Sequence, residues 1–145
     1  MASNAVSAFG TLLKIGDGAT PTEGFTTVAE LRTISGPSLT AETIDVTVHN
    51  TPTPYRRYIS GLLDGGEVTF DINFIPTDPT HGYSAGLLKD MTERTRRNFK
   101  IIFPDSGNTE WLLPTVITGF EMSSDPADVL LASVTLKVAG PPTLQ

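Results

Sequence analysis

Cysteine is absent from the 145-residue sequence, which excludes disulfide bonds and thiolate metal sites. The apolar runs are short, so we expect no membrane-spanning segment, and residues 1–10 lack the basic start and long apolar stretch of a secretory signal. Cations are also few, because 10 Lys and Arg stand against 16 Asp and Glu and give a net charge of −6. A protein that grips nucleic acid needs clustered cations, so this balance argues against that class. We expect a protein that is made and kept inside a cell.

Side chains arranged for catalysis are equally scarce. The two histidines, His49 and His81, lie in a proline-rich stretch and near an expected helix start, and we interpret both as surface residues. Residues 16–18 form a turn that lacks the alternating oxygen ligands of a calcium loop. The sequence has no glycine-rich phosphate loop, no Gly-x-Ser-x-Gly elbow and no paired histidines on a helix. We predict that the protein is not an enzyme and needs no cofactor.

The clearest pattern that is present is a strand within residues 61–79, which follows a turn at residues 64–66. Its apolar members are Val68, Phe70, Ile72 and Phe74, and its polar members are Glu67, Thr69, Asp71 and Asn73. Side chains on a strand point alternately to opposite faces, so this strand has one buried face and one wet face. The wet face carries two carboxylates and no cation.

Shorter apolar and alternating runs predict further strands, over residues 9–15, 25–34, 96–103, 110–113, 115–122 and 128–139. One helix is expected over residues 78–93, with Asp78 as its cap. Its apolar stripe would be Tyr83, Leu87, Leu88 and Met91, and its polar side Lys89, Asp90, Glu93 and Arg94. This order predicts a single domain over residues 1–145 that is mainly β, an antiparallel β-sandwich or barrel with one flanking α-helix.

Residues 35–63 are a long excursion between two of these strands. Polar and apolar residues alternate over residues 43–48, and Pro52 and Pro54 then end any strand. Four aromatic and basic residues follow the prolines. They are Tyr55, Arg56, Arg57 and Tyr58, which are of the types enriched at interface hot spots. Two interpretations remain open, an interaction loop and a plain surface hairpin. Residues 1–8 are either a frayed terminus or an arm that orders against a neighbour, and residues 140–145 form a tail.

A second basic segment contains Arg94, Arg96, Arg97 and Lys100, interleaved with Phe99 and Phe103. It could be a solvated or subunit-pairing patch, or it could grip DNA. Three classes of function are therefore compared: an enzyme, a ligand-binding module and a self-assembling structural protein. The only tryptophan, Trp111, is expected in the core, which leaves no aromatic pocket for a ligand. A self-assembling protein explains the Tyr-Arg segment and the unpatterned termini best.

Several segments together resemble the tail tube (major tail) proteins of bacteriophages with long, non-contractile tails. They are ISGPSL with ETIDVT in residues 34–47, GLLDGGEV in residues 61–68 and ASVTLKV in residues 132–138. The resemblance covers about residues 9–140 and is a pattern over length without a catalytic motif. Pro52, Pro54 and the two arginines after them depart from it, so the contacts of that loop are particular to this chain.

The resemblance implies a β-sandwich-like domain whose six copies close into a ring, with rings stacked into a tube. It implies an inner wall made by strands from all six subunits, and assembly in the host cytoplasm around a tape-measure protein, between tail-tip and tail-terminator proteins. The finished virion tail would conduct double-stranded DNA without binding it specifically, and would hold no membrane segment. The alternative is a soluble β-sandwich ligand-binding module or another phage structural protein, such as a minor tail or head–tail connector protein.

Two groups of candidate residues follow, the first from the barrel that the resemblance implies and the second from the Tyr-Arg and basic segments described above. The candidate lumen-facing residues are Glu67, Thr69, Asp71, Asn73, Thr43 and Asp45, which Thr47, Ser133, Thr135 and Lys137 could join. The candidate inter-ring or inter-subunit contacts are Tyr55, Arg56, Arg57, Tyr58, Arg96 and Arg97.

Overall fold

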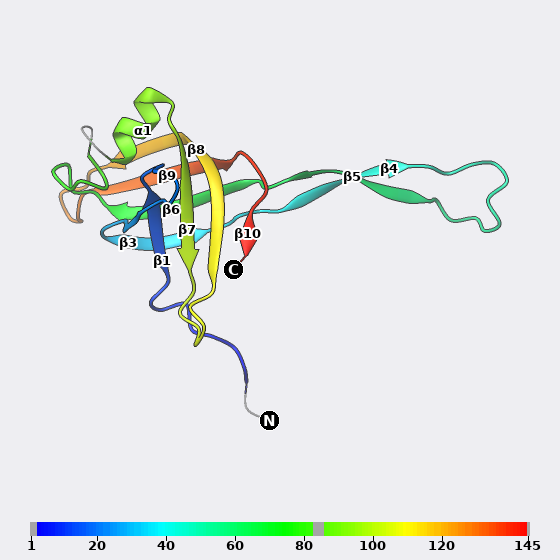
Figure 1. Cartoon of the computed structure of the whole chain (residues 1–145), viewed down its shortest axis with the longest axis horizontal. Coiled ribbons are helices and arrows are strands. Elements are labelled where there is room, and N and C mark those ends of the chain that lie inside the picture. The colour runs from blue at the N-terminus through cyan, green and yellow to red at the C-terminus, as the bar shows by residue number, and fades with distance from the viewer. Residues whose placement is uncertain (1–2, 83–85, 145) are drawn as a thin grey trace.

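The computed structural model describes residues 3–82 and 86–144, and within them the chain is mainly antiparallel β-structure with one helix (Figure 1). The strands are β1 (Leu12–Gly16), β2 (Phe25–Thr27), β3 (Leu31–Ser35), β4 (Thr40–Asp45), β5 (Tyr58–Asp64), β6 (Glu67–Asn73), β7 (Arg96–Ile102), β8 (Glu110–Ser123), β9 (Leu131–Val138) and β10 (Thr143–Leu144). The helix is α1 (Leu87–Glu93). The expected class, mainly β with one flanking helix, is confirmed.

One large sheet carries the body of the domain, in the order β2-β1-β7-β8-β9-β6-β3, with β10 added to β8. Strand β8 is 14 residues long, and it pairs with β7 through its first part and with β9 through its second. The two pairings overlap at Thr115 and Val116, and a register shift follows between Ile117 and Gly119. The sheet therefore folds into two halves that run in different directions, as β7 and β9 show in Figure 1.

The core lies between these two halves. Leu13, Phe99 and Leu113 come from the half that contains β7, and all three are fully buried. Phe70 and Leu136 meet them from the half that contains β6 and β9. Each such side chain contributes about 1.5–3 kcal/mol by leaving water. The predicted alternation of β6 is confirmed, because its even-numbered positions 68, 70 and 72 are buried and positions 67, 69 and 71 are exposed.

The first half of the expected helix is wrong. Asp78 does not cap a helix, because its Oδ1 accepts hydrogen bonds from the backbone N–H of Thr80 at 2.8 Å and from the Thr80 hydroxyl, and these bonds hold a turn. The helix begins nine residues later, at Leu87, and Gly86 caps it without a side-chain bond. Tyr83 of the expected apolar stripe lies outside the described residues. Asp90, expected on the polar side, is buried.

The surface assignment of His81 is also wrong, because this side chain is fully buried. Its Nδ1 accepts the backbone N–H of Ile75 at 3.1 Å, so Nε2 carries the hydrogen and donates to the carbonyl of Ala29 at 2.7 Å. The ring also stacks on Phe74, with 6.2 Å between centroids. His81 therefore ties the segment after β6 to the segment before β3, and both of its nitrogens are used for this purpose.

Strands β4 and β5 form a separate two-stranded sheet that projects far from the body (Figure 1). Most of residues 35–63 form this hairpin, and the interaction role predicted for them stays a prediction. The two legs of the hairpin continue the strands of the body directly, since residues 36–39 alone separate β3 from β4 and residues 65 and 66 alone separate β5 from β6. The hairpin is thus an extension of the β3-β6 pair.

Candidate assembly surfaces

The outer side of the second half-sheet is a continuous polar surface, which we call the wet face. Register places Asp71 of β6 beside Thr33 of β3 and Ser133 of β9, and Ser133 beside Glu121 of β8. Thr33 donates its hydroxyl to Oδ2 of Asp71 at 3.1 Å. The adjoining row consists of Ser35, Thr69, Thr135 and Gly119. Thus four candidate lumen residues, Glu67, Thr69, Asp71 and Asn73, lie on one surface with Ser133, Thr135 and Lys137.

Charge on the wet face is mainly negative. Glu67, Asp71 and Glu121 are exposed carboxylates. Lys137 lies opposite Glu67 in the register, but its Nζ pairs with Asp64 at 3.2 Å. Arg32 lines a groove of about 420 Å³ together with Asp71 and Glu121. Hydroxyls and carboxylates therefore dominate the wet face. Of its two nearby cations, Lys137 is already neutralised by Asp64.

Two candidate lumen residues, Thr43 and Asp45, do not belong to the wet face, because they lie on β4 of the projecting hairpin. Asp45 accepts the backbone N–H of Thr47 at 2.9 Å and pairs with Arg56 at 3.6 Å. Hydrogen bonds from Thr47, assisted by the charge of Arg56, lower the pKa of the Asp45 carboxyl below its ordinary value. Asp45 therefore stabilises the hairpin itself.

One face of the hairpin is an apolar stripe. Ile44 lies opposite Ile59, and their side chains are 47% and 54% exposed. Val46 continues the stripe beyond β4 by the alternation of the strand, and its backbone N–H donates to the carbonyl of Arg57 at 2.9 Å. A two-stranded hairpin is marginally stable alone in water, and this one also exposes aliphatic side chains. Contact with another surface would stabilise the hairpin and remove these aliphatic side chains from water.

The predicted Tyr-Arg segment lies at the far end of the hairpin, on its returning leg. Tyr55 and Tyr58 are exposed, and Arg56 makes an exposed ion pair with Asp45. The backbone N–H of Arg57 donates to the Thr47 hydroxyl at 2.8 Å, which holds the two legs together. The four residues are therefore presented to the surroundings.

Arg96 and Arg97, the other predicted contacts, lie on β7 in the body and away from this tip (Figure 1). The guanidinium of Arg97 is bound within the subunit, where Nε and Nη2 reach Oδ1 of Asp90 at 3.1 and 3.0 Å and Nη1 reaches the carbonyl of Gly16 at 3.2 Å. Burial raises the pKa of Asp90, and the charge of Arg97 offsets part of that rise. Arg96 donates to the carbonyl of Ala139 at 3.1 Å and stays exposed.

A joint of glycines connects the hairpin to the body, and sequence reasoning assigned it no role. Gly36 has φ of +107°, and a Cβ there would come within 2.4 Å of the carbonyl oxygen of Glu67. Gly66 has φ of +70°, and its Cβ would come within 2.1 Å of the carbonyl oxygen of Ser38. Only glycine fits both conditions. The ISGPSL and GLLDGGEV segments are therefore the two sides of this joint.

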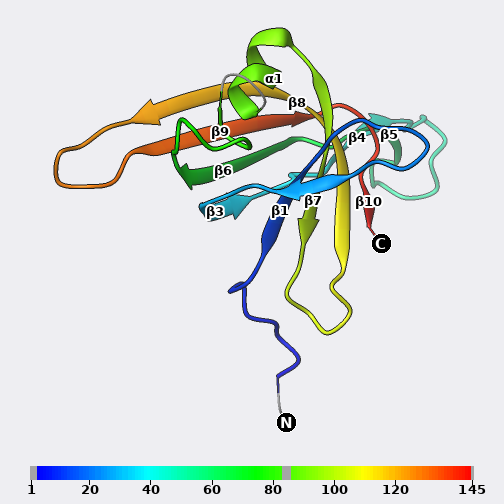
Figure 2. The same ribbon diagram turned by 60° about the vertical axis from the view of Figure 1, so that its left-hand side comes forward.

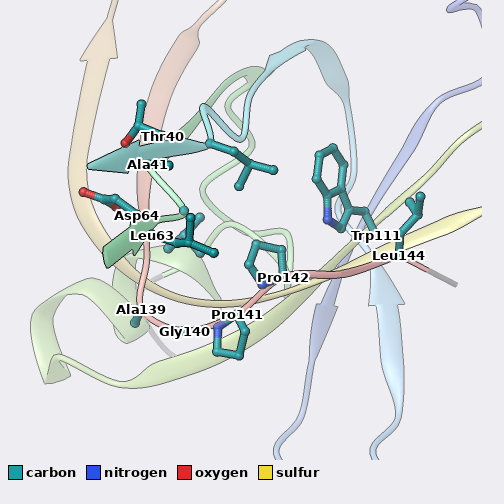
Figure 3. Close-up of a pocket in the computed structure, with 13 residues that line it drawn as sticks. Thr40, Ala41, Leu63, Asp64, Trp111, Ala139, Gly140, Pro141, Pro142 and Leu144 are labelled. Carbon is teal, nitrogen blue, oxygen red and sulfur yellow. The ribbon is translucent and has the colours of Figure 1, made fainter. Parts of the chain in front are cut away.

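An open apolar groove of about 880 Å³ lies at the base of the hairpin, and we call it the root groove. Its lining includes Leu39, Ala41, Leu63, Trp111, Val138 and Leu144. Figure 3 shows Trp111 and Leu144 on one side, Ala41 and Leu63 on the other, and Pro142 between them. Trp111 packs against the core but is only partly buried, so its second side faces this groove. The single tryptophan and the paired prolines of the tail were the signals that could have revealed it.

Among residues 3–82 and 86–144, no cluster of His, Cys, Asp and Glu could hold a metal ion. No helix in that part of the chain is long and apolar enough to cross a membrane. A β-sandwich with a projecting hairpin, a polar sheet face and an open apolar groove has the architecture of a structural subunit built for contact with other proteins.

The sequence matches the lambda phage tail tube protein family over residues 16–145, and the chain belongs to that family. It is a structural subunit of a phage tail tube, it is not an enzyme, and its place is the virion tail. The search of curated proteins gave no match.

Solved structures share the fold. A chain from the virion of a native gene transfer agent particle has a TM-score of 0.75 and 20% identity, with 97% of this chain and 99% of that chain covered. A chain from the tail of the empty gene transfer agent particle has a TM-score of 0.70 and 22% identity, with 92% and 95% covered. A chain from the sheath/tube terminator of the PVC extracellular contractile injection system has a TM-score of 0.73 and 12% identity, with 100% of this chain and 99% of that chain covered.

Proposed function

We propose that six copies of the chain close into a ring, that rings stack into a tube, and that the wet face of β3, β6, β9 and β8 lines the lumen through which the genome reaches the host. One observation carries the proposal. Strands β2 and β3 end the large sheet, and neither has a second neighbour among the described residues. Open edges invite pairing with another chain, and ring closure would satisfy them. The related gene transfer agent tail was refined with C6 symmetry, which supports the number six.

The chemistry of the wet face suits a wall along which DNA slides. Each cation that touches a phosphate adds affinity and therefore friction. Glu67, Asp71 and Glu121 repel phosphate, while the hydroxyls of Thr69 and Ser133 keep water at the surface. During assembly the same lumen would hold the tape-measure protein, and tail-tip and terminator proteins would meet the ends of the tube.

The hairpin is the proposed contact between rings. Its apolar stripe would be covered by the neighbouring ring, and the exposed Tyr55, Arg56, Arg57 and Tyr58 at its far end would provide the aromatic and charged anchors. Because these residues contribute nothing to the buried core, the body should fold without them.

The decisive experiment images the purified protein by negative-stain and cryo-electron microscopy. Wild-type protein should form rings and tubes, and a variant with all four residues 55–58 changed to Ala should fold with an unchanged circular dichroism spectrum but form no tubes. A matched control changes Thr51 and Thr53 of the same tip to Ala and should form tubes. Protein that stays monomeric at every concentration would contradict the assembly proposal. A map that places Glu67 and Asp71 on the outer surface of the tube would contradict the lumen assignment.

A further inference from the structure

Phe9 is 92% exposed, although its position is well defined by local bonds. The backbone N–H of Thr11 donates to the carbonyl of Ala8 at 3.2 Å, and the Thr11 hydroxyl donates to the same carbonyl at 2.8 Å. Gly10, the third residue of this turn, has φ of +97°, as a type II turn requires. Phe9 is the second residue of the turn, so its ring stands at the corner. We call residues 8–11 the Phe9 turn.

The Phe9 turn does not use its own subunit for burial. Figures 1 and 2 show the N-terminal segment leaving the body at the end opposite to α1 and pointing away from it. Residues 3–13 contain no charged side chain, and Val6 is exposed as well. Within it, residues 3–10 are all exposed, and they would span about 27 Å if extended.

The root groove is the complementary feature. It is open, its lining is mostly aliphatic and aromatic, and its one carboxylate, Asp64, is already paired with Lys137. The outer edge of β10 pairs with no strand of the described residues, so backbone groups are also available at its border. A groove of this size and lining binds an uncharged segment with an apolar anchor.

We propose that the root groove binds the Phe9 turn of a second copy of the chain, with the Phe9 ring against Trp111. This inference rests on the proposed assembly, because it requires a second copy within reach. The hairpin tip is another exposed segment, but it leads into Arg56 and Arg57 and would find no free carboxylate in the groove. The contact is head-to-tail, so each copy gives one turn and receives one, which continues along a closed ring or a growing tube.

The test uses two full-length variants that damage opposite partners. Phe9→Ala removes the anchor and Leu144→Glu places a charge in the groove, and both positions are exposed, so folding should be unchanged. Each variant alone should lose more than tenfold of the tube mass that pellets from wild-type protein, whereas the controls Phe9→Leu and Leu144→Met should retain it. A 1:1 mixture should form discrete complexes in sedimentation velocity, because one variant keeps its groove and the other keeps its turn.

Two results would overturn the inference. One is Phe9→Ala protein that assembles as wild type does, and the other is a 1:1 mixture in which the two variants form no complex in sedimentation velocity. A titration separates this inference from the assembly proposal. A peptide of residues 1–11 added to wild-type protein should shift the emission of Trp111, the only tryptophan, and the Phe9→Ala peptide should not. If wild-type protein never assembles, the proposed function fails, but the titration still tests whether the root groove binds the Phe9 turn. An emission spectrum that the natural peptide does not shift would contradict that binding.

Discussion

Replacing Arg97 by methionine removes the only cation that contacts the buried carboxylate of Asp90 within the described part of the chain. Asp90 is 1% exposed, and both of its contacts from Arg97 reach the same oxygen, Oδ1. Arg97 was predicted as a subunit contact, but its guanidinium also links α1 to Gly16 at the end of β1. The substitution therefore asks whether this arginine serves the fold of one subunit or the assembly of several.

Breaking a buried ion pair from one side costs about 3–5 kcal/mol, because the other charge stays behind without compensation. Arg97 keeps 22% exposure, so water can partly replace it, and we expect the lower end, about 3 kcal/mol. For a domain of this length, such a loss lowers Tm by roughly 10 °C. Arg96 is the matched control, since it makes one exposed bond to a carbonyl, and Arg96→Met should stay within about 0.5 kcal/mol of wild type.

The pH dependence gives a second signature of the same cause. Burial raises the pKa of Asp90 above its ordinary value of 3.8, and Arg97 opposes that rise, so removal of Arg97 raises the pKa further. A raised pKa means that the native state binds the proton more tightly than the unfolded state. The resulting stabilisation is complete below the unfolded pKa and is lost as pH rises through the folded pKa. The deficit of Arg97→Met should therefore shrink from pH 7 towards pH 4.

Urea denaturation of Arg97→Met, Arg96→Met and wild type at several pH values measures both effects. A double variant, Asp90→Leu with Arg97→Met, removes both charges and should recover at least half of the loss. Arg97→Met protein that is as stable as wild type but forms no tubes would refute this reasoning and favour the subunit-contact role.

Three further predictions concern the wet face and the joint. Changing Glu67 and Asp71 to Lys should alter the free energy of unfolding by no more than about 0.5 kcal/mol and leave tubes intact. DNA ejection should slow, most at low salt where screening is weak. Ejection at the wild-type rate would argue against a lumen position. Gly66→Ala should cost at least about 1 kcal/mol in urea denaturation, because of its positive φ and a backbone oxygen too close to the new Cβ, whereas Gly107→Ala, with open space around it, should cost less. The Gly66 N–H and Lys137 favour the Asp64 carboxylate and lower its pKa, so the Tm deficit of Asp64→Asn should be present at pH 7 and be lost as pH falls from 3.8 through the lowered pKa of the folded state. A deficit independent of pH would exclude the charge as its cause.

The strands with one buried face could be predicted because burial imposes a period of two on the sequence. Residues 67–73 satisfy that condition, and so do residues 131–138. The predicted helix start at Asp78 was wrong for a local reason. The Asp78 carboxylate accepts the backbone N–H of Thr80 in a turn, and the same kind of hydrogen bond would cap a helix. Asp90 and His81 were misplaced because burial of a polar group depends on partners in other elements, here Arg97 on β7 and Ala29 before β3.

The candidate surfaces show the same limit. The polar residues of β6 were found from their own pattern, but the neighbours that complete the wet face, such as Thr33 and Glu121, follow from the register of four strands. Thr43 and Asp45 have the same alternation, yet they lie on the hairpin, because a strand exposed on both sides gives no sign of which sheet it joins. The root groove combines residues 39–41 with residues 138–144, which no local pattern connects.

The direct continuation of the hairpin legs into β3 and β6 has a mechanical consequence. A pull on the far end of the hairpin travels along covalent backbone into β6, which is registered with β9 over seven residue pairs. The force then acts parallel to the strands, so those hydrogen bonds share the load in shear instead of opening one after another. The short links at residues 36–39 and 65–66 leave little slack to absorb it. A subunit built in this way would transmit tension applied at its hairpin to the centre of its sheet without first unravelling.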